Sequence, residues 1–439
     1  MVLGLLATMS FNFVDTMFVS WLDGEGPLAA MTLTFPVIMV VTSVAIGLGA
    51  GASSAIARAV GMGNEEAVRR LATDAITLAT LISVLVCILG WLTIDPLFIA
   101  LGAGPELLPL VRDYMEIWYL SAPFLLVPMI SLSALRALGF ARIQGTLMAF
   151  AAILNACLDP LFIFGFEFIP RMEIQGAALA TLITRVLTLI GAIYYLQGRM
   201  HVLTSPITSW ANIKASWIRV GRVGIPAMVS NLIIPVASFF VINLVISFGN
   251  HAVAGLGAAL RVEPVVLIVF YALSGVVGPF SGQNEGAARY ERLFEMLRVV
   301  SIFCIGFGLL VALVLFIGAP YVVELFDQEQ DVDQVVISYL TIVPFSYGAY
   351  GLVMSAIAVF NGLGQPVPGF TISFLRVLGL YLPMALLGKW LFGLTGLFMA
   401  TALANVMVGL IAYIWLRKTL HKVANQTRVG NDSDLVATQ

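Results

Sequence analysis

Asp15 is the residue of this sequence whose position most strongly calls for a chemical explanation. It lies in the apolar run Phe11–Val19, with no basic residue within reach along the same helix. A lone carboxylate at the centre of a membrane span costs about 2.5 to 3.5 kcal/mol, so such a residue usually faces a cavity, pairs with a partner or takes up a proton. Asp15 is therefore our first candidate for a functional residue.

A second polar group occurs later in the first half of the chain, at Asn155 and Asp159. These two residues are four apart, so on a helix they share one face. Thr181 stands one helical turn before Arg185 in the next apolar run. Together with Asp15, the group could form a hydrated pocket whose oxygen atoms bind a hard monovalent cation such as Na⁺, or equally a proton.

Simpler interpretations of this group stay open. Asp159 precedes Pro160 and could cap or pair near the end of its helix. Asn155 and Thr181 could make the ordinary hydrogen bonds that join helices in membranes. Asp15 is harder to explain without a function, because no comparable structural role suggests itself.

The second half of the chain carries its own charges within apolar sequence, at Arg261, Glu263 and Arg376. Arg261 and Glu263 are two residues apart, so on a helix they point in different directions and are not natural partners. Glu263 could be a second carboxylate that binds a proton or a cation, or it could form a salt bridge with Arg376. The sequence favours neither interpretation.

The composition places the chain in a membrane. Of its 439 residues 60% are hydrophobic and only 10% are charged, with a mean hydropathy of +1.01. So little polar surface cannot cover a soluble globule. The three cysteines all lie in apolar runs, which indicates packing roles and neither a disulfide nor a metal framework. Nothing in the charge pattern indicates nucleic-acid binding.

Apolar runs of spanning length predict twelve transmembrane helices. The candidate bends are Pro36, Pro123, Pro128, Pro226, Pro235, Pro264, Pro344 and Pro383. Asp15 lies close to Met1, whereas a span needs about 20 residues, so we expect the native first helix to begin upstream. The expected ranges are 1–22, 28–60, 71–94, 107–137, 143–166, 174–197, 218–248, 251–281, 292–319, 333–362, 366–389 and 393–416.

The distribution of basic residues predicts the orientation. Most of the 22 Lys and Arg fall in loops on one side of the predicted spans, and only Arg112, Arg171 and Lys389 fall on the other. Because loops rich in Lys and Arg stay on the cytoplasmic side, we expect both termini in the cytoplasm.

An internal repeat divides the chain in two. The turn Gly61–Glu65 after the second predicted helix recurs as Gly282–Glu285 after the eighth, in the same orientation, which is typical of a parallel six-plus-six repeat. We therefore expect an N-terminal six-helix lobe over 1–197, a cytoplasmic linker over 198–217, a C-terminal six-helix lobe over 218–416 and a cytoplasmic tail over 417–439. In such folds the substrate binds between the halves.

Over nearly its whole length the sequence resembles the multidrug and toxic compound extrusion (MATE) family, and within it the branch named for the DNA-damage-inducible F protein. The resemblance rests on the order and spacing of several motifs, namely Asn12–Val19, Gly61–Ala67, Leu158–Phe162, Gly176–Thr181, Arg261–Glu263, Gly282–Gly286 and Gly362–Gly364.

The resemblance implies a proton- or sodium-coupled antiporter that exports cationic, lipophilic compounds across the inner membrane. It implies that Asp15 is the coupling residue and that Asn155, Asp159 and Thr181 surround it. Protonation of Asp15 would let the first helix repack and expel the substrate. We expect a multi-pass monomer in contact with membrane lipid, with no cofactor besides the coupling ion, no nucleic-acid partner and no metal besides a possible Na⁺.

Two other function classes compete with this one. A lipid-linked oligosaccharide or lipid flippase of the same superfamily would hold an anionic pyrophosphate and line its cleft with several Arg or Lys, whereas here the acidic and basic residues within spans are balanced. A membrane enzyme would need a catalytic constellation. All three histidines lie in loops or the tail, and no phosphate-binding glycine loop is present, so we expect no enzyme.

Overall fold

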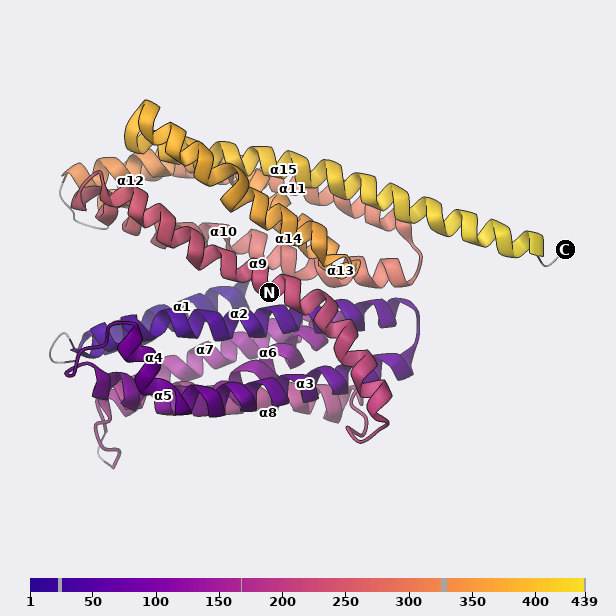
Figure 1. Cartoon of the computed structure of the whole chain (residues 1–439), viewed down its shortest axis with the longest axis horizontal. Coiled ribbons are helices and arrows are strands. Elements are labelled where there is room, and N and C mark those ends of the chain that lie inside the picture. The colour runs from indigo at the N-terminus through magenta and orange to yellow at the C-terminus, as the bar shows by residue number, and fades with distance from the viewer. Residues whose placement is uncertain (23–25, 167, 325–329, 438–439) are drawn as a thin grey trace. The chain divides into compact units, whose positions relative to one another are not determined.

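Helices account for almost all of the computed structural model, as the composition predicts. The structure describes residues 1–22, 26–166, 168–324 and 330–437, without the side chains of 10–13, 15–16, 20, 239, 324, 330 and 426–437. Within these ranges there is no β-sheet, only one isolated bridge between Phe166 and Ile169. The predicted all-α membrane fold is confirmed (Figure 1).

The first half of the chain forms eight helices. Two of them, α5 and α6, make up the single span predicted over 107–137 and meet at an angle of 43°. The bend lies at Ser121, two residues before Pro123, where the missing proline N–H interrupts the helix. The helices are α1 (Val2–Ser20), α2 (Gly26–Gly61), α3 (Glu65–Leu92), α4 (Ile94–Ala100), α5 (Leu108–Leu120), α6 (Ala122–Ala137), α7 (Ala141–Ile163) and α8 (Glu173–Ile193), which continues as the π-helical stretch η1 (Tyr194–Arg199).

The second half repeats this plan with more interruptions. The span predicted over 333–362 is broken by a short 3₁₀ segment at Pro344, and the last two predicted spans are joined at Gly393, whose φ of +61° favours glycine. The elements are α9 (Trp210–Ile246), α10 (Asn250–Gly286), α11 (Tyr290–Glu324), α12 (Gln330–Ile342), the 3₁₀ segment η2 (Val343–Ser346), α13 (Tyr347–Gly362), α14 (Pro366–Phe374), the π-helical stretch η3 (Leu375–Tyr381) and α15 (Leu382–Ala437).

Helix α9 begins at Trp210, inside the range 198–217 that we expect for the linker. Residues of α3 contact this region. The backbone N–H of Thr204 donates to Thr73 at 2.9 Å, and the indole N–H of Trp217 donates to the carbonyl of Asp74 at 3.0 Å. Asp74 is itself fully buried in an ion pair with Arg70. These anchors explain why helix starts earlier than the hydrophobicity of the sequence indicates.

Internal contacts divide the chain into two compact units. We call residues 1–56 and 64–228 the first lobe, and residues 57–63 and 229–439 the second lobe. The boundaries fall inside α2 and α9, so two continuous helices contribute to both lobes.

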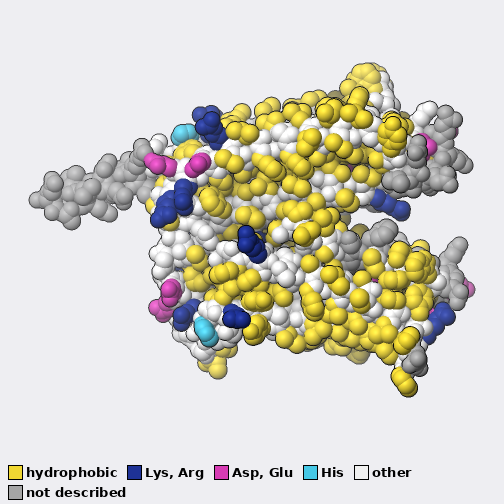
Figure 2. Space-filling model, turned by 180° about the vertical axis from the view of Figure 1, so that it is seen from behind, with side chains coloured by type: hydrophobic (Ala, Val, Ile, Leu, Met, Phe, Trp, Pro, Cys, Tyr) yellow, Lys and Arg dark blue, Asp and Glu magenta, His cyan; other side chains and the backbone are white. Residues whose placement is uncertain are grey.

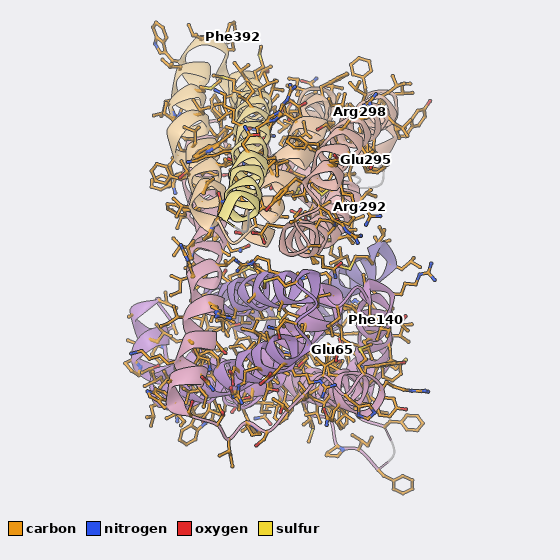
Figure 3. All side chains as sticks on the ribbon, turned by 90° about the vertical axis from the view of Figure 1, so that its right-hand side faces the viewer. Glu65, Phe140, Arg292, Glu295, Arg298 and Phe392 are labelled. Atoms are coloured by element: carbon orange, nitrogen blue, oxygen red, sulfur yellow. The ribbon has the colours of Figure 1, made fainter. Side chains whose placement is uncertain are left out.

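Apolar side chains cover the flanks of the helices. Ile302, Leu309 and Ile317 on α11 are all more than half exposed, which suits a surface in contact with lipid. Figure 2 shows hydrophobic side chains over most of the visible flanks, with charged ones mostly near helix ends. Figure 3 labels Arg292, Glu295 and Arg298 on the first turns of α11. Within the described ranges, nine helices are long and apolar enough to cross a membrane, or ten if α5 and α6 form one bent span.

Candidate functional site

The first lobe places α7 between α1 and α8. Glycines make these contacts close: a methyl group on Gly4 of α1 would lie 2.7 Å from the carbonyl oxygen of Gly145, and one on Gly176 of α8 would lie 2.4 Å from that of Phe162. Near the other end of α1, Phe18 packs edge-on against Phe164 at 6.3 Å. The helix that carries Asn155 and Asp159 is therefore packed against the helices that carry Asp15 and Thr181.

Asn155 and Asp159 form a buried pair on α7. Both side chains are fully buried, and the Nδ2 of Asn155 donates to the Oδ1 of Asp159 at 3.0 Å. The Oδ1 of Asn155 is also buried and has no hydrogen-bond partner among the described residues. Asp159 lies near the end of α7, which stops at Ile163, and it pairs there with Asn155, so the simpler interpretation of this residue stays open.

For the other predicted members of this group the structure gives the helix on which each lies. Thr181 is buried on α8, which packs along α7. Arg185, one turn further, donates to the hydroxyl of Ser121 at the α5–α6 bend and lies over the ring of Trp118, 5.4 Å from its centre. Asp15 belongs to α1, but its side chain lies outside the described residues.

This arrangement has the chemistry of a small cation or proton site. It offers a carboxylate, an amide oxygen without a donor and a buried hydroxyl on neighbouring helices. Oxygen ligands suit hard cations, and a buried carboxylate is also a natural proton acceptor.

The second lobe contains a cavity of about 310 Å³. Four helical elements bring tyrosines to its wall: Tyr271 on α10, Tyr339 on α12, Tyr350 on α13 and Tyr381 on η3. The remaining wall is mainly aliphatic, from α9, α10 and α15. The cavity therefore joins aromatic faces and hydroxyl groups to an otherwise apolar surface.

Glu263 and Arg376 both line this cavity, but they do not form an ion pair with each other in the described part of the chain. The carboxylate of Glu263 accepts a hydrogen bond from the hydroxyl of Tyr339. The guanidinium of Arg376 lies over the ring of Tyr350, 4.5 Å from its centre. The charge of Arg376 is still near enough to act on Glu263. Arg261, the other candidate in this lobe, is exposed and is not part of the wall.

Sequence reasoning missed the tyrosines and Asn405, which lines the cavity and donates to the hydroxyl of Ser346 at 3.0 Å. A usable signal was present. The chain has only 12 tyrosines, and a tyrosine within an apolar span needs a partner for its hydroxyl. Tyr339, Tyr350 and Tyr381 all lie in predicted spans of the second half.

Comparisons with known proteins give this architecture its family. The model of the MatE family matches residues 1–161 and 226–387. The chain belongs to this family. The MATE chain is also 34% identical to a protein of Shewanella oneidensis named "FAD transporter", over 97% of this chain and 94% of that protein. It is 25% identical to the multidrug export protein MepA of Staphylococcus aureus, over 94% and 90% of the two chains.

Solved structures agree with the family assignment. The crystal structure of the MATE transporter VcmN of Vibrio cholerae in its bent form superimposes with a TM-score of 0.91, at 33% identity, covering 96% of this MATE chain and 95% of that one. The resemblance to the MATE family and the predicted fold of twelve transmembrane helices are thereby confirmed. This MATE chain is a multi-pass membrane protein of a family of transporters.

Proposed function

We propose that this protein is a secondary active antiporter that exports cationic, lipophilic compounds in exchange for H⁺ or Na⁺, with Asp15 as the coupling carboxylate. The observation that carries the proposal is the buried pair of Asn155 and Asp159 on α7, the helix that packs along α1. Relatives named for multidrug export support the substrate class.

The coupling follows from electrostatics. In the outward-facing state Asp15 takes up a proton or is neutralised by Na⁺, which removes its net charge from an apolar helix. Helix α1 then repacks against α7, the space in the first lobe shrinks and the substrate leaves. Release of the ion on the cytoplasmic side restores the carboxylate, which accepts the next cationic substrate. Ion and substrate are coupled because they stabilise different arrangements of the same helix.

The same proposal includes the setting of the protein. The protein is a monomer in the inner membrane. Both termini lie in the cytoplasm, because basic residues gather on that side of the predicted spans. The ends of α2 and α6, where Arg58 and Arg136 lie, would then face the cytoplasm.

Everted membrane vesicles test the proposal. We expect the wild type to accumulate ethidium when the vesicle interior is made acidic or is loaded with Na⁺, and the gradient that works names the ion. Asp15→Asn should abolish the accumulation. Asp95→Asn is the matched control, because Asp95 is an exposed residue paired with Arg112 away from the polar group. An Asp15→Asn protein that still pumps against a gradient would contradict the assignment.

A second substrate class has an observation of its own in its favour. The relative named "FAD transporter" is 34% identical over almost the whole chain, and the second-lobe cavity combines tyrosines with an arginine. Export of a flavin dinucleotide is therefore the second candidate function. The same vesicles, with either gradient imposed, would reveal this function as uptake of FAD that ethidium does not inhibit.

A further inference from the structure

We propose that the cavity of the second lobe binds a planar aromatic ligand with an acidic group, and that Arg376 binds the acid while the tyrosines contact the ring. This inference rests on the second candidate function, flavin export, and deepens it, because it names a class of substrate and the residues that select it. Three observations carry it: the unused hydrogen-bond donors of Arg376, the hydrogen bond that Glu263 already accepts, and the wall residues and volume of the cavity.

Arg376 has hydrogen-bond donors to spare. A guanidinium carries five N–H groups in a planar fork that fits a carboxylate or phosphate. One face of Arg376 is covered by the ring of Tyr350, yet its N–H groups donate to no other residue in the described part of the chain. The side chain is half-buried and lines the cavity. Arg376 therefore presents an unused anion-binding edge to the cavity.

Three other basic side chains of the described helices have protein partners. Lys389, in the same lobe, donates to the hydroxyl of Ser247 at 2.6 Å, and Arg70 and Arg112 in the first lobe form ion pairs. A charge in a membrane protein is expensive unless it is paired or faces water or a ligand. Arg376 lies in the π-helical stretch η3, and such irregular turns often occur at functional sites.

Glu263 does not accept hydrogen bonds from Arg376 among the described residues. Its carboxylate is held by the hydroxyl of Tyr339, and no ion pair joins it to Arg376 among the described residues. The cavity therefore has one acid with a donor already bound to it and one base without an acceptor. This imbalance favours a ligand that supplies acceptor atoms over a ligand that supplies only positive charge.

The walls and the volume define the rest of the ligand. Tyr271, Tyr339 and Tyr381 line the cavity with aromatic side chains, and most of the other wall residues are aliphatic. A volume of about 310 Å³ is at the lower end of the range for small-molecule sites, about 300 to 1,000 Å³. The cavity is thus large enough for one fused ring system with one acidic group, and a longer ligand such as a dinucleotide would have to extend beyond it.

Flavin mononucleotide and riboflavin test this inference directly, because they share one ring system and differ by a phosphate. Binding to the purified full-length protein in detergent would be measured from the quenching of flavin fluorescence. We expect flavin mononucleotide to bind about tenfold tighter than riboflavin or more, since a charge-assisted hydrogen bond contributes about 1.5 to 3 kcal/mol.

The variants separate recognition from folding. Arg376→Gln should remove the preference for the phosphate and leave riboflavin binding within twofold of wild type. Arg376→Lys should keep only part of the preference, because an ammonium cannot form the two-pronged contact. Lys389→Gln, which removes a positive charge from the same lobe outside the cavity, should keep all of it. A thermal melt of each variant checks that it is folded.

Several results would overturn the inference. Equal affinity of the wild type for the two flavins would do so. A phosphate preference that survives Arg376→Gln would also do so. A third such result is an Arg376→Lys variant that binds neither flavin. Tight binding of ethidium that depends on Glu263 and displaces flavin mononucleotide would assign the cavity to cations. Displacement by phosphatidylglycerol, which lacks an aromatic ring, would assign Arg376 to a lipid headgroup.

Failure of this inference and failure of the proposed function can be distinguished. Flavin binding needs no ion gradient, so Asp15→Asn should bind flavin mononucleotide as the wild type does even though it cannot pump. Gradient-driven ethidium transport without any flavin binding would leave the proposed function intact and reject the inference alone. Flavin binding without gradient-driven transport of any substrate would do the reverse.

Discussion

The two lobes are built from the same repeated sequence plan but hold their buried charges in different ways. In the first lobe the carboxylate of Asp159 is fully buried and accepts a hydrogen bond from an amide one turn away on the same helix. In the second lobe Glu263 is held by a tyrosine from another helix, and a guanidinium faces the same cavity. The first arrangement suits a small ion, and the second suits an organic ligand.

The difference teaches that a repeat conserves the scaffold more than the chemistry. Glycines shape both lobes. In the first lobe Gly176 allows two helices to approach closely, and in the second lobe Gly393 allows the chain to turn between two spans. The residues that face inward from the scaffold then differ. We therefore propose a division of work in which ion coupling takes place in the first lobe and aromatic acids bind in the second.

Replacing each lobe's carboxylate by its amide tests this division with the largest expected effect. Asp159→Asn should lower gradient-driven ethidium transport about tenfold to a hundredfold, because a hydrogen bond to a charged group contributes about 1.5 to 3 kcal/mol. Glu263→Gln should lower it less than threefold. Initial rates in everted vesicles, normalised to the amount of protein, measure both. Equal losses in the two variants would show that coupling is not confined to the first lobe.

The closeness of the first-lobe helices predicts the next largest effect. A methyl group at Gly176 would lie 2.4 Å from the backbone oxygen of Phe162, where no side chain can move aside. Gly176→Ala should therefore destabilise the protein by about 1 to 3 kcal/mol. In the second lobe, a methyl group added at Gly257 of α10 would lie in open space. Gly257→Ala should therefore be neutral or stabilising by up to about 1 kcal/mol. Thermal unfolding followed by tryptophan fluorescence compares them, and similar melting temperatures would refute the packing argument.

Much of the scaffold could be predicted from the sequence, because hydrophobic length and proline position have direct structural consequences. Each of the twelve predicted spans corresponds to an observed helix or to a chain of short helices. Interruptions occur near Pro123 and Pro344, whereas the candidate bends at Pro36, Pro128 and Pro264 lie inside continuous helices. The linker was harder to predict. Its helix starts at Trp210 because Trp217 bonds to Asp74 on α3, a contact between residues far apart in the chain.

The candidate sites could be predicted only where one helix determines them. Asn155 and Asp159 are neighbours through helical spacing alone, so their pairing follows from sequence. The second-lobe cavity depends on tyrosines from four elements and on the π-helical turn that carries Arg376. Neither convergence leaves a periodic pattern in the sequence, so Glu263 could be recognised as unusual but not paired with Tyr339.

Removing the hydroxyl that holds Glu263 should have a smaller effect than the changes above. Tyr339→Phe keeps the ring and its packing against Phe398, 5.2 Å away, but removes the hydrogen bond to the carboxylate. We expect a loss of about 1 to 2 kcal/mol in stability, because a partly buried acceptor loses its donor. Tyr413→Phe is the control, since that hydroxyl bonds to no described residue. Equal melting temperatures for the two variants would mean that Tyr339 does not hold Glu263.

The smallest effect concerns a neutral hydrogen bond within the second lobe. The Nδ2 of Asn405 on α15 donates to the Oγ of Ser346 on η2 at 3.0 Å. Side-chain hydrogen bonds between membrane helices contribute about 0.6 kcal/mol on average in double-mutant cycles. The cycle of Asn405→Ala, Ser346→Ala and the double variant should give a coupling energy near that value. The cycle of Asn155→Ala and Asp159→Ala should give about 1.5 kcal/mol or more, because one partner is ionisable. If the two coupling energies are equal, the Asn155–Asp159 pair is no stronger than an ordinary contact between helices, and the argument that the first lobe is specialised for ions loses its energetic basis.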